Sequence, residues 1–364
     1  MTATLATDPP MAPLLEPVTF AGMPLVSRIV MAPMTRNHAP GGVPAPAVAN
    51  YYRRRAENGI GLIITEGVLV GHLSASHEDT VPRMTAGPAE VSWRRVIDGV
   101  HDAGGRIAAQ LWHLGSLREP VDGLPAWTPS GVHEPRRPAG HAMTVADIDE
   151  LLEAYAEAAR VAARAGFDAV EIHAAHGYLL DEFLWPYTNR RADAFGGSPA
   201  RRAGFPAAVV RAVRSQLPAD YPVIVRFSQF KERAFDARIA DTPAELAEIL
   251  TAFADAGASA LHASQRRFWE PAFAGSPLNL AGWAKRLTGL PSITVGSVGL
   301  TRDFLRVGGP ETVSGLVERL TGGEFDLVAL GRILLANPGW ATHAAAGRLE
   351  AIADYRKSHE ELYY

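Results

Sequence analysis

One unit recurs along nearly the whole chain and limits the folds open to it. Each unit has a short apolar run rich in β-branched residues, a loop with glycine or proline, an amphipathic helical stretch and a terminating glycine. The predicted strands lie at residues 28–34, 61–66, 106–112, 168–173, 223–227, 260–263, 292–295 and 326–330. Strands that alternate with helices pair in parallel, and eight such units close into a barrel. We therefore predict an α/β protein with a (β/α)8 TIM barrel, and keep an open doubly wound sheet as the alternative.

Capping motifs mark the starts of two of the predicted helices. Thr242 is followed by Pro243 and Glu245, a capping box with proline where its missing N–H costs nothing. Thr144 and Asp147 begin another helix in the same way. The helix after Thr144 then presents one apolar stripe, as expected of a helix that packs on a sheet, and the helix after Thr242 ends at Gly257.

One connection is much longer than the others. Residues 115–143 separate the third predicted strand from its helix and include several prolines and glycines. Long loops in compact domains usually serve function, and this one leaves the rim where active sites of (β/α)8 barrels lie. We expect it to cap the substrate. The predicted organisation is one barrel over residues 14–350, a capping subdomain at 115–143 within it, and an N-terminal extension at 1–13.

Composition excludes several kinds of site and partner. The chain has no cysteine, which rules out disulfides, thiolate zinc sites, cysteine nucleophiles and iron–sulfur clusters. The 35 basic and 39 acidic residues form no long blocks, so neither nucleic acid nor a membrane surface is an expected partner. With no long apolar run or leader-like start, a cytoplasmic location is predicted. The oligomeric state is left open, a homo-oligomer included.

Polar side chains stand at the ends of the predicted strands, where a purely structural barrel would carry apolar residues or simple turns. The carboxyl ends of parallel strands lie on one rim, so these side chains are expected to converge on a single site. They are Thr35, Arg36, Glu66, Gln110, His173, His176, Arg226, Ser297 and Arg332.

The motifs around these residues resemble those of the Old Yellow Enzyme family of FMN-dependent ene-reductases. The matching segments are APMTR at 32–36, ITEG at 64–67, QLWHLG at 110–115, EIHAAHGYLLD at 171–181, NRR at 189–191, FGGS at 195–198 and DLVALGR at 326–332. They occur in the family's order, and the resemblance covers about residues 17–340.

The resemblance implies that FMN binds at this rim. Thr35 would donate a hydrogen bond near the flavin C4 carbonyl, Gln110 would pair with the pyrimidine edge, and Arg226 would lie beside N1 and O2. The phosphate would lie after strands seven and eight, with Arg332 supplying charge. The other implied FMN contacts are Ala32, Pro33, Met34, Gly67, Gly296, Ser297, Val298, Gly299 and Gly331.

The resemblance also implies the reaction. His173 and His176 would hold an oxygen of a small-molecule substrate, hydride would come from the flavin, and Tyr178 would protonate the α-carbon. NADPH or NADH would supply the electrons. The implied function is reduction of the activated C=C bond of α,β-unsaturated carbonyl compounds. From side-chain chemistry we place Trp112 in the substrate pocket, together with Phe268 and Trp269 from the loop after strand six.

Other interpretations stay open at this point. The same flavin site could reduce nitro groups or nitrate esters, or oxidise an intermediate of secondary metabolism. The barrel could also be a flavin-binding protein without turnover. His173 and His176 could be packed rim histidines or, at their spacing of three, metal ligands, although no metal site is predicted. Two departures from the family pattern concern the pocket: Ser116 stands where many relatives carry arginine, and residues 227–232 are unusually aromatic and basic.

Overall fold

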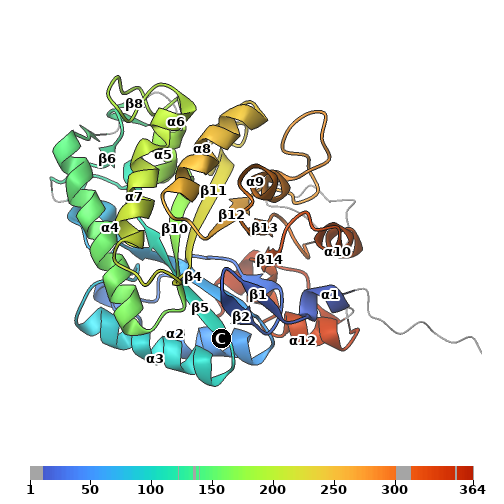
Figure 1. Ribbon diagram of the computed structural model, residues 1–364. Coiled ribbons are helices and arrows are strands. Elements are labelled where there is room, and N and C mark those ends of the chain that lie inside the picture. The colour runs from blue at the N-terminus through green and yellow to red at the C-terminus, as the bar shows by residue number, and fades with distance from the viewer. Residues whose placement is uncertain are drawn as a thin grey trace, which may run out of the picture.

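Eight parallel strands close into a barrel in the order of the sequence (Figure 1). The structure is a computed structural model and describes residues 11–121, 123–133, 137–138, 140–300, 313–348 and 351–363. The barrel strands are β3 (Ile29–Met31), β4 (Leu62–Leu69), β5 (Arg106–Trp112), β10 (Ala169–His176), β11 (Val223–Lys231), β12 (Ala260–Ser264), β13 (Ser292–Val295) and β14 (Leu327–Leu330). The predicted (β/α)8 fold is therefore confirmed, and the open sheet is excluded.

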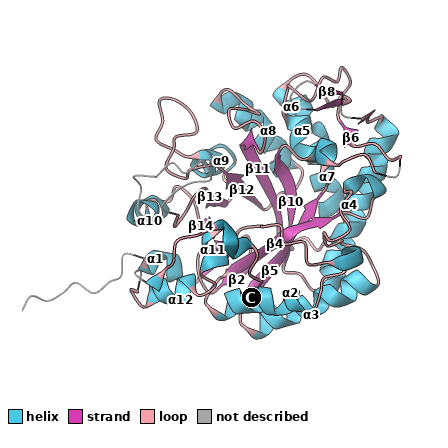
Figure 2. Ribbon diagram, turned by 180° about the vertical axis from the view of Figure 1, so that it is seen from behind, coloured by secondary structure: helices cyan, strands magenta, loops and turns pink. Residues whose placement is uncertain are grey.

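Helices surround the barrel on its outer face, as Figure 2 shows in cyan around the magenta strands. Both predicted capping boxes are present, at Thr144 and Thr242. The α-helices are α1 (Ala12–Leu15), α2 (Ala47–Glu57), α3 (Pro88–Asp102), α4 (Val145–Ala165), α5 (Leu179–Leu184), α6 (Pro199–Arg202), α7 (Gly204–Arg214), α8 (Pro243–Asp255), α9 (Leu280–Thr288), α10 (Val313–Thr321), α11 (Ile333–Ala336) and α12 (Trp340–Ala345). Short 3₁₀ helices lie at η1 (Pro40–Gly42), η2 (Leu73–Ala75), η3 (Gly115–Leu117) and η5 (Lys357–Glu360).

The amino-terminal end of the barrel is closed by a hairpin of β1 (Val18–Phe20) and β2 (Met23–Leu25). Phe20, Met23 and Leu25 pack against inward-facing barrel residues such as Val30 and Ile293. Because strand side chains alternate, the same inward face carries Gln110, Glu171, Arg226 and His262 nearer the carboxyl ends. The barrel interior thus changes from apolar to polar toward the rim where the site was predicted.

The predicted extension at residues 1–13 lies mostly outside the described residues, which begin at Met11. Met11 is buried in the core beside the short helix α1, which begins at Ala12. Within the described residues, no helix is both long and apolar enough to cross a membrane.

The long connection 115–143 contains two small strand pairs. β6 (Trp127–Thr128) pairs with β9 (His141–Ala142), and β7 (Val132–His133) pairs with β8 (Arg137–Pro138). Residues 122, 134–136 and 139 of the predicted capping subdomain lie outside the described residues.

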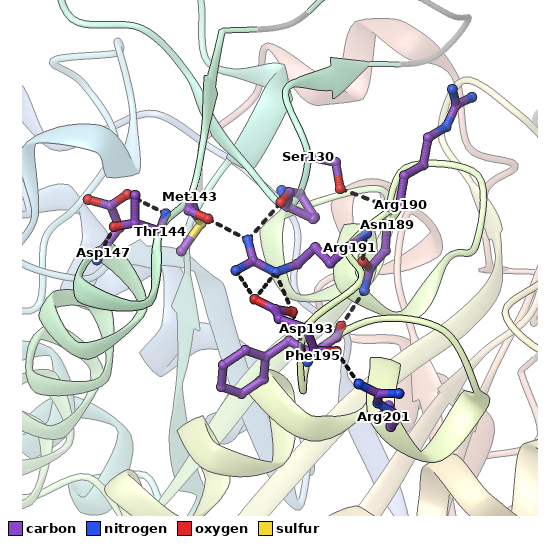
Figure 3. A network of polar contacts seen from close by, with 11 residues as sticks. Ser130, Met143, Thr144, Asp147, Asn189, Arg190, Arg191, Asp193, Phe195 and Arg201 are labelled. Carbon is purple, nitrogen blue, oxygen red and sulfur yellow. Dashed lines mark hydrogen bonds and ion pairs between the residues drawn. The ribbon is translucent and has the colours of Figure 1, made fainter.

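Arg191 fastens this connection to the segment after α5 (Figure 3). Its Nη1 donates to the carbonyl of Pro129 over 2.9 Å and also to the carbonyl of Met143. Its Nε donates to Asp193 over 3.0 Å. The NRR motif therefore has a structural role: it fixes the middle and the carboxyl-terminal end of the excursion to the chain that follows α5.

The segment after the predicted barrel, residues 351–363, returns to the rim. The ring of Tyr363 stacks on His38 at 3.7 Å and on Tyr51 of α2 at 4.6 Å between centroids. Arg36 donates a hydrogen bond to the carbonyl of Leu362 over 2.7 Å. The carboxyl terminus therefore lies beside α2, as both views show.

Candidate active site

Two adjoining cavities lie at the carboxyl ends of the barrel strands. The first has a volume of about 480 Å³ and the second about 500 Å³, within the range of roughly 300–1,000 Å³ usual for small-molecule sites. Both are lined by Pro33, Met34, His176, Arg226, Glu232 and Arg332. The two cavities therefore form one continuous site.

Most residues predicted from the sequence line these cavities. The first cavity is lined by the phosphate-binding candidates Gly296, Ser297, Val298 and Gly331, together with Ala32. The second is lined by Thr35, Gly67, Gln110, Trp112, His173 and Tyr178. The cofactor-binding and catalytic candidates are thus brought to one place.

Three of the cofactor-binding and substrate-pocket candidates, Gly299, Phe268 and Trp269, line neither cavity, and the strand-end residue Glu66 does not line them either. Gly299 lies beside Ile333 and Trp340 instead. Phe268 is buried in the core, and its ring packs edge-on against Trp269 at 5.1 Å. The two aromatic rings of the loop after β12 therefore pack against each other rather than line the site. The residues of this region that line the first cavity are Ser264, Gln265 and Arg266.

A buried polar chain crosses the floor of the site. Gln110 Nε2 donates to Glu171 Oε1 over 2.8 Å, and His262 Nδ1 lies 2.6 Å from Glu171 Oε2. All three side chains are buried. A carboxylate only accepts hydrogen bonds, so it fixes the Gln110 amide with its nitrogen toward Glu171. The amide oxygen is then left to accept a hydrogen bond from a ligand in the second cavity.

Arg226 is a buried cation with no hydrogen-bond or ion-pair partner among the described residues. Its side chain is 6% exposed and lines both cavities. Among the described residues it forms neither an ion pair nor a hydrogen bond, and its Nε is buried without a partner. Burying an uncompensated charge is costly. This arrangement therefore fits a ligand that brings acceptor oxygens or negative charge to Arg226.

A bulge brings His173 and His176 together. Residues three apart on a regular strand face opposite sides. The register of β10 against β11 shifts between Ala174 and His176, and His176 has a left-handed φ of 68°. The two rings consequently lie 5.3 Å apart, nearly perpendicular. His176 Nε2 is 2.7 Å from Ser264 Oγ, whereas His173 Nδ1 is buried without a partner among the described residues.

Both histidines are held neutral. Burial lowers their pKa well below the usual value, and the nearby Arg226 guanidinium lowers it further. Each neutral imidazole carries one N–H donor and one acceptor nitrogen. In the described part of the chain, no three histidine, aspartate or glutamate side chains are arranged to hold a metal ion, so the metal interpretation gains no support.

Tyr178 packs against His173 and Trp112. Its ring centroid is 4.9 Å from that of His173 and 4.9 Å from that of Trp112, edge-on to the indole. The phenol donates a hydrogen bond to Glu232 Oε1 over 3.2 Å. Burial raises the pKa of Tyr178, and the Glu232 carboxylate raises it further, so the phenol keeps its proton near neutral pH.

Glu66 positions the loop after β3, and Gly67 leaves room for the indole of Trp112. Glu66 Oε2 accepts the backbone N–H groups of Arg36 and Asn37 over 2.8 and 3.0 Å, which holds the loop that carries Thr35. A Cβ at position 67 would lie 2.4 Å from the indole of Trp112. Glycine is therefore required there for Trp112 to pack against β4.

Several cavity residues were not predicted as site residues from the sequence. Phe230 lies at the end of β11 and Glu232 directly follows this strand. Glu360 comes from the carboxyl-terminal segment. The unusual composition of residues 227–232 was a signal that this loop shapes the pocket. Glu360 had no local signal, because only folding brings it to the rim.

A closed (β/α)8 barrel that brings a buried arginine and two histidines into one cavity at its strand ends is typical of a cofactor-binding barrel enzyme. The sequence profile of the NADH:flavin oxidoreductase / NADH oxidase family matches residues 13–350. The chain belongs to this family, which includes the Old Yellow Enzymes, and is a flavin oxidoreductase. FMN and NAD(P)H are the family's cofactors.

Known relatives agree in sequence and in fold. The chain is 34% identical over 348 residues to 12-oxophytodienoate reductase 7 of Oryza sativa subsp. japonica, covering 90% of this chain and 86% of the relative. A structure of morphinone reductase in complex with tetrahydroNAD superposes with a TM-score of 0.81 at 28% identity, covering 95% of this chain and 93% of the other. The Old Yellow Enzyme homologue from Zymomonas mobilis gives a TM-score of 0.80 at 26% identity, covering 95% and 96%.

Proposed function

We propose that this enzyme uses NADH or NADPH to reduce the activated C=C bond of α,β-unsaturated carbonyl compounds. The observation that carries the proposal is the grouping of two neutral histidines and one protonated tyrosine around a cavity floored by Arg226 and Gln110. Such a set can polarise an oxygen and protonate a carbon on the same small molecule.

The residues present fit FMN. Arg226 and the amide oxygen of Gln110 offer a cation and an acceptor to the pyrimidine part of the ring, with Thr35 nearby in the second cavity. Of the residues predicted for the phosphate, Gly296, Ser297, Val298 and Gly331 line the first cavity, and Arg332 lines both. When bound, FMN supplies hydride transfer between a nicotinamide and the substrate.

Side chains of the protein bind the substrate oxygen and supply the proton. One N–H donor from each histidine would hold the carbonyl oxygen and stabilise the negative charge that develops on it. Because the histidine N–H groups are assigned to the carbonyl oxygen, the proton at the α-carbon is assigned to the Tyr178 phenol, which lines the same cavity. Trp112 forms a wall of the same cavity and limits access to it.

Spectroscopy tests the cofactor and the histidine pair. The purified protein is expected to be yellow and to release FMN on denaturation; a colourless protein that does not take up added FMN would contradict the proposal. A phenolate ligand held by the histidines should stack on the flavin and give a long-wavelength absorption band. His173→Ala should remove this band, whereas Asp236→Asn, which changes an exposed carboxylate outside both cavities, should retain it.

The choice of substrate is tested by comparing oxidants. Tyr178→Phe should slow the reoxidation of reduced enzyme by an enone by on the order of 100-fold, since a positioned general acid is worth about that much. Reduction by NADH or NADPH should be little changed. If an enone does not reoxidise the wild-type enzyme while a nitro compound or nitrate ester does, alkene reduction is wrong and the same site serves nitro chemistry.

A further inference from the structure

Glu232 occupies a central place in the site that neither the family motifs nor the proposed function explains. Of the described residues that line both cavities, it is the one carboxylate. Its side chain remains exposed to solvent through the open cavity. It therefore links the interior of the site to bulk water.

Glu232 forms hydrogen bonds with two of the residues assigned to catalysis. Its Oε1 accepts the hydrogen bond from the Tyr178 phenol over 3.2 Å. Its backbone N–H donates to the carbonyl of His176 over 3.2 Å. Glu232 thus touches both the proposed proton donor and the chain that carries the oxygen-binding pair.

A buried ion pair holds this geometry in place. The side chains of Lys231 and Asp181 are 1% and 0% exposed, and Lys231 Nζ lies 2.7 Å from Asp181 Oδ2. The same Asp181 oxygen accepts the backbone N–H of Gly177 over 2.6 Å. The pair therefore locks the end of β11 to the turn that leads into Tyr178. A pair buried this completely is better explained by positioning than by stability alone.

Burial, rather than the surrounding charges, favours a Glu232 carboxyl group that can hold a proton. Loss of surrounding water raises its pKa, although the hydrogen bond from Tyr178 and the guanidinium groups of Arg233 and Arg226 oppose this shift. The other titratable or charged groups on the elements that face it are His176, Lys231, Arg332, Arg36, Arg266 and Glu360, and Glu78 acts on Tyr178.

Tyr178 needs such a partner. A phenolate beside a carboxylate is unfavourable, as the raised pKa of Tyr178 indicates. After Tyr178 has given up its proton, the nearest group able to restore it is the one already hydrogen bonded to its oxygen. Within the described residues, Glu232 is the side chain with a hydrogen bond to that phenol.

We propose that Glu232 is a positioning and proton-relay residue, which passes a proton from solvent to Tyr178 during alkene reduction. The proposal rests on the proposed function. As the α-carbon forms its C–H bond, the Tyr178 O–H bond breaks, and the carboxylic proton of Glu232 moves to the phenol oxygen. The Glu232 carboxylate then takes a proton from water, so Tyr178 is regenerated and the substrate gains one hydride and one proton in total.

The first test compares Glu232→Gln with wild type in the reoxidation of reduced enzyme by an enone. The wild-type rate constant should fall as pH rises through the pKa of Glu232, because the relay needs the protonated acid. Glu232→Gln should lose this inflection and slow the step by about tenfold, less than the direct loss of a general acid. Glu232→Asp should restore the inflection. Reoxidation by a quinone, which needs no carbon protonation, and reduction by NADH or NADPH should slow by less than the enone step does.

A double-mutant cycle shows whether the two residues act as one unit. Tyr178→Phe combined with Glu232→Gln should be no slower than Tyr178→Phe alone, because the relay has no acceptor without the phenol. If the rate loss of the double variant equals the product of the losses of the two single variants, the relay is wrong. A pH inflection that persists in Glu232→Gln would also overturn it.

A readout independent of turnover uses the FMN-free protein. Its infrared difference spectrum on titration should contain the C=O band of a protonated carboxyl group that is absent from Glu232→Gln and present in Asp236→Asn, the control on the same loop. Absence of such a band from wild type would overturn the proposal. If the wild type does not reduce enones at all, the proposed function fails with it; if Tyr178→Phe impairs enone reduction and Glu232→Gln does not, only the relay fails.

Discussion

Gln110 and Glu171 form a hydrogen bond of 2.8 Å that is buried beneath the site, with Gln110 Nε2 as donor. The second carboxylate oxygen of Glu171 is engaged by His262 at 2.6 Å. The carboxylate therefore sets the orientation of an amide whose remaining oxygen faces the cavity. A residue that touches no ligand thus determines which hydrogen-bonding group the floor presents.

Glu171→Gln should weaken FMN binding. An amide at position 171 can donate as well as accept, so the Gln110 amide loses its fixed orientation and its match to the ring edge. The loss of one well-directed hydrogen bond corresponds to about tenfold in affinity. Titration of the FMN-free protein, followed by quenching of flavin fluorescence, measures it. An unchanged dissociation constant would show that Glu171 does not orient Gln110.

Arg226→Met should affect the FMN-free and FMN-loaded protein in opposite directions. The guanidinium has no protein partner among the described residues, so its removal relieves the cost of a buried charge. Thermal unfolding of the FMN-free variant should occur at an equal or higher temperature than that of wild type. Its affinity for FMN should fall by about 100-fold, as for loss of a charge-assisted hydrogen bond. A large loss of stability without FMN would contradict this account.

Glu66 should make stability fall as pH rises toward neutrality. Burial raises its pKa from 4.5 to about 7, despite the hydrogen bonds from the backbone of Arg36 and Asn37. The folded protein therefore binds a proton that the unfolded chain releases, and this contribution, full at low pH, is lost through about pH 7.

Glu66→Gln isolates this contribution, because residue 66 then does not titrate. Relative to the variant, the free energy of unfolding of wild type should fall by about 3 kcal/mol as pH increases from 4.5 to about 7. Urea unfolding of both proteins on either side of that interval measures the difference. A constant difference across the interval would show that Glu66 has an ordinary pKa in the folded state.

The sequence allowed the barrel to be predicted because its signals are local. Each strand was visible as a short apolar run, and each of the two capping boxes occupies four consecutive residues. The site followed from the fold rule that strand ends share one rim. Gln110, His173 and Arg226 could thus be assigned to one site before any contact between them was known.

The parts that could not be predicted depend on departures from regular geometry or on distant contacts. Strand β10 extends to His176 through a bulge, and β11 extends to Lys231, past the predicted ends at 173 and 227. These extensions bring Glu232 to Tyr178, which no spacing rule indicates. Phe268 and Trp269 were placed in the pocket on composition alone, but the direction of a loop side chain is set by packing.

The carboxyl-terminal segment should slow the release of FMN. Tyr355 lies against the guanidinium of Arg332, 5.5 Å from its carbon to the ring centroid, and Glu360 lines the second cavity. The segment is held at Ala353, whose backbone N–H and carbonyl each bond to Asn337 over 2.8 Å. Deletion from residue 354 onward should therefore leave the barrel folded while removing one wall of the site.

Loss of the cation–π contact between Arg332 and Tyr355 and of the hydrogen bond from Arg36 to Leu362, each worth about 1 kcal/mol, predicts that the deletion speeds FMN dissociation by about 30-fold. Tyr355→Ala should account for part of this effect through Arg332. Tyr363→Ala is the matched control, because its ring stacks on His38 and Tyr51 away from both cavities and should act only by loosening the segment. Dissociation is measured from the recovery of flavin fluorescence after dilution into excess competing apoprotein. Equal rates for the deletion and wild type would show that the segment covers the rim without contributing to cofactor retention.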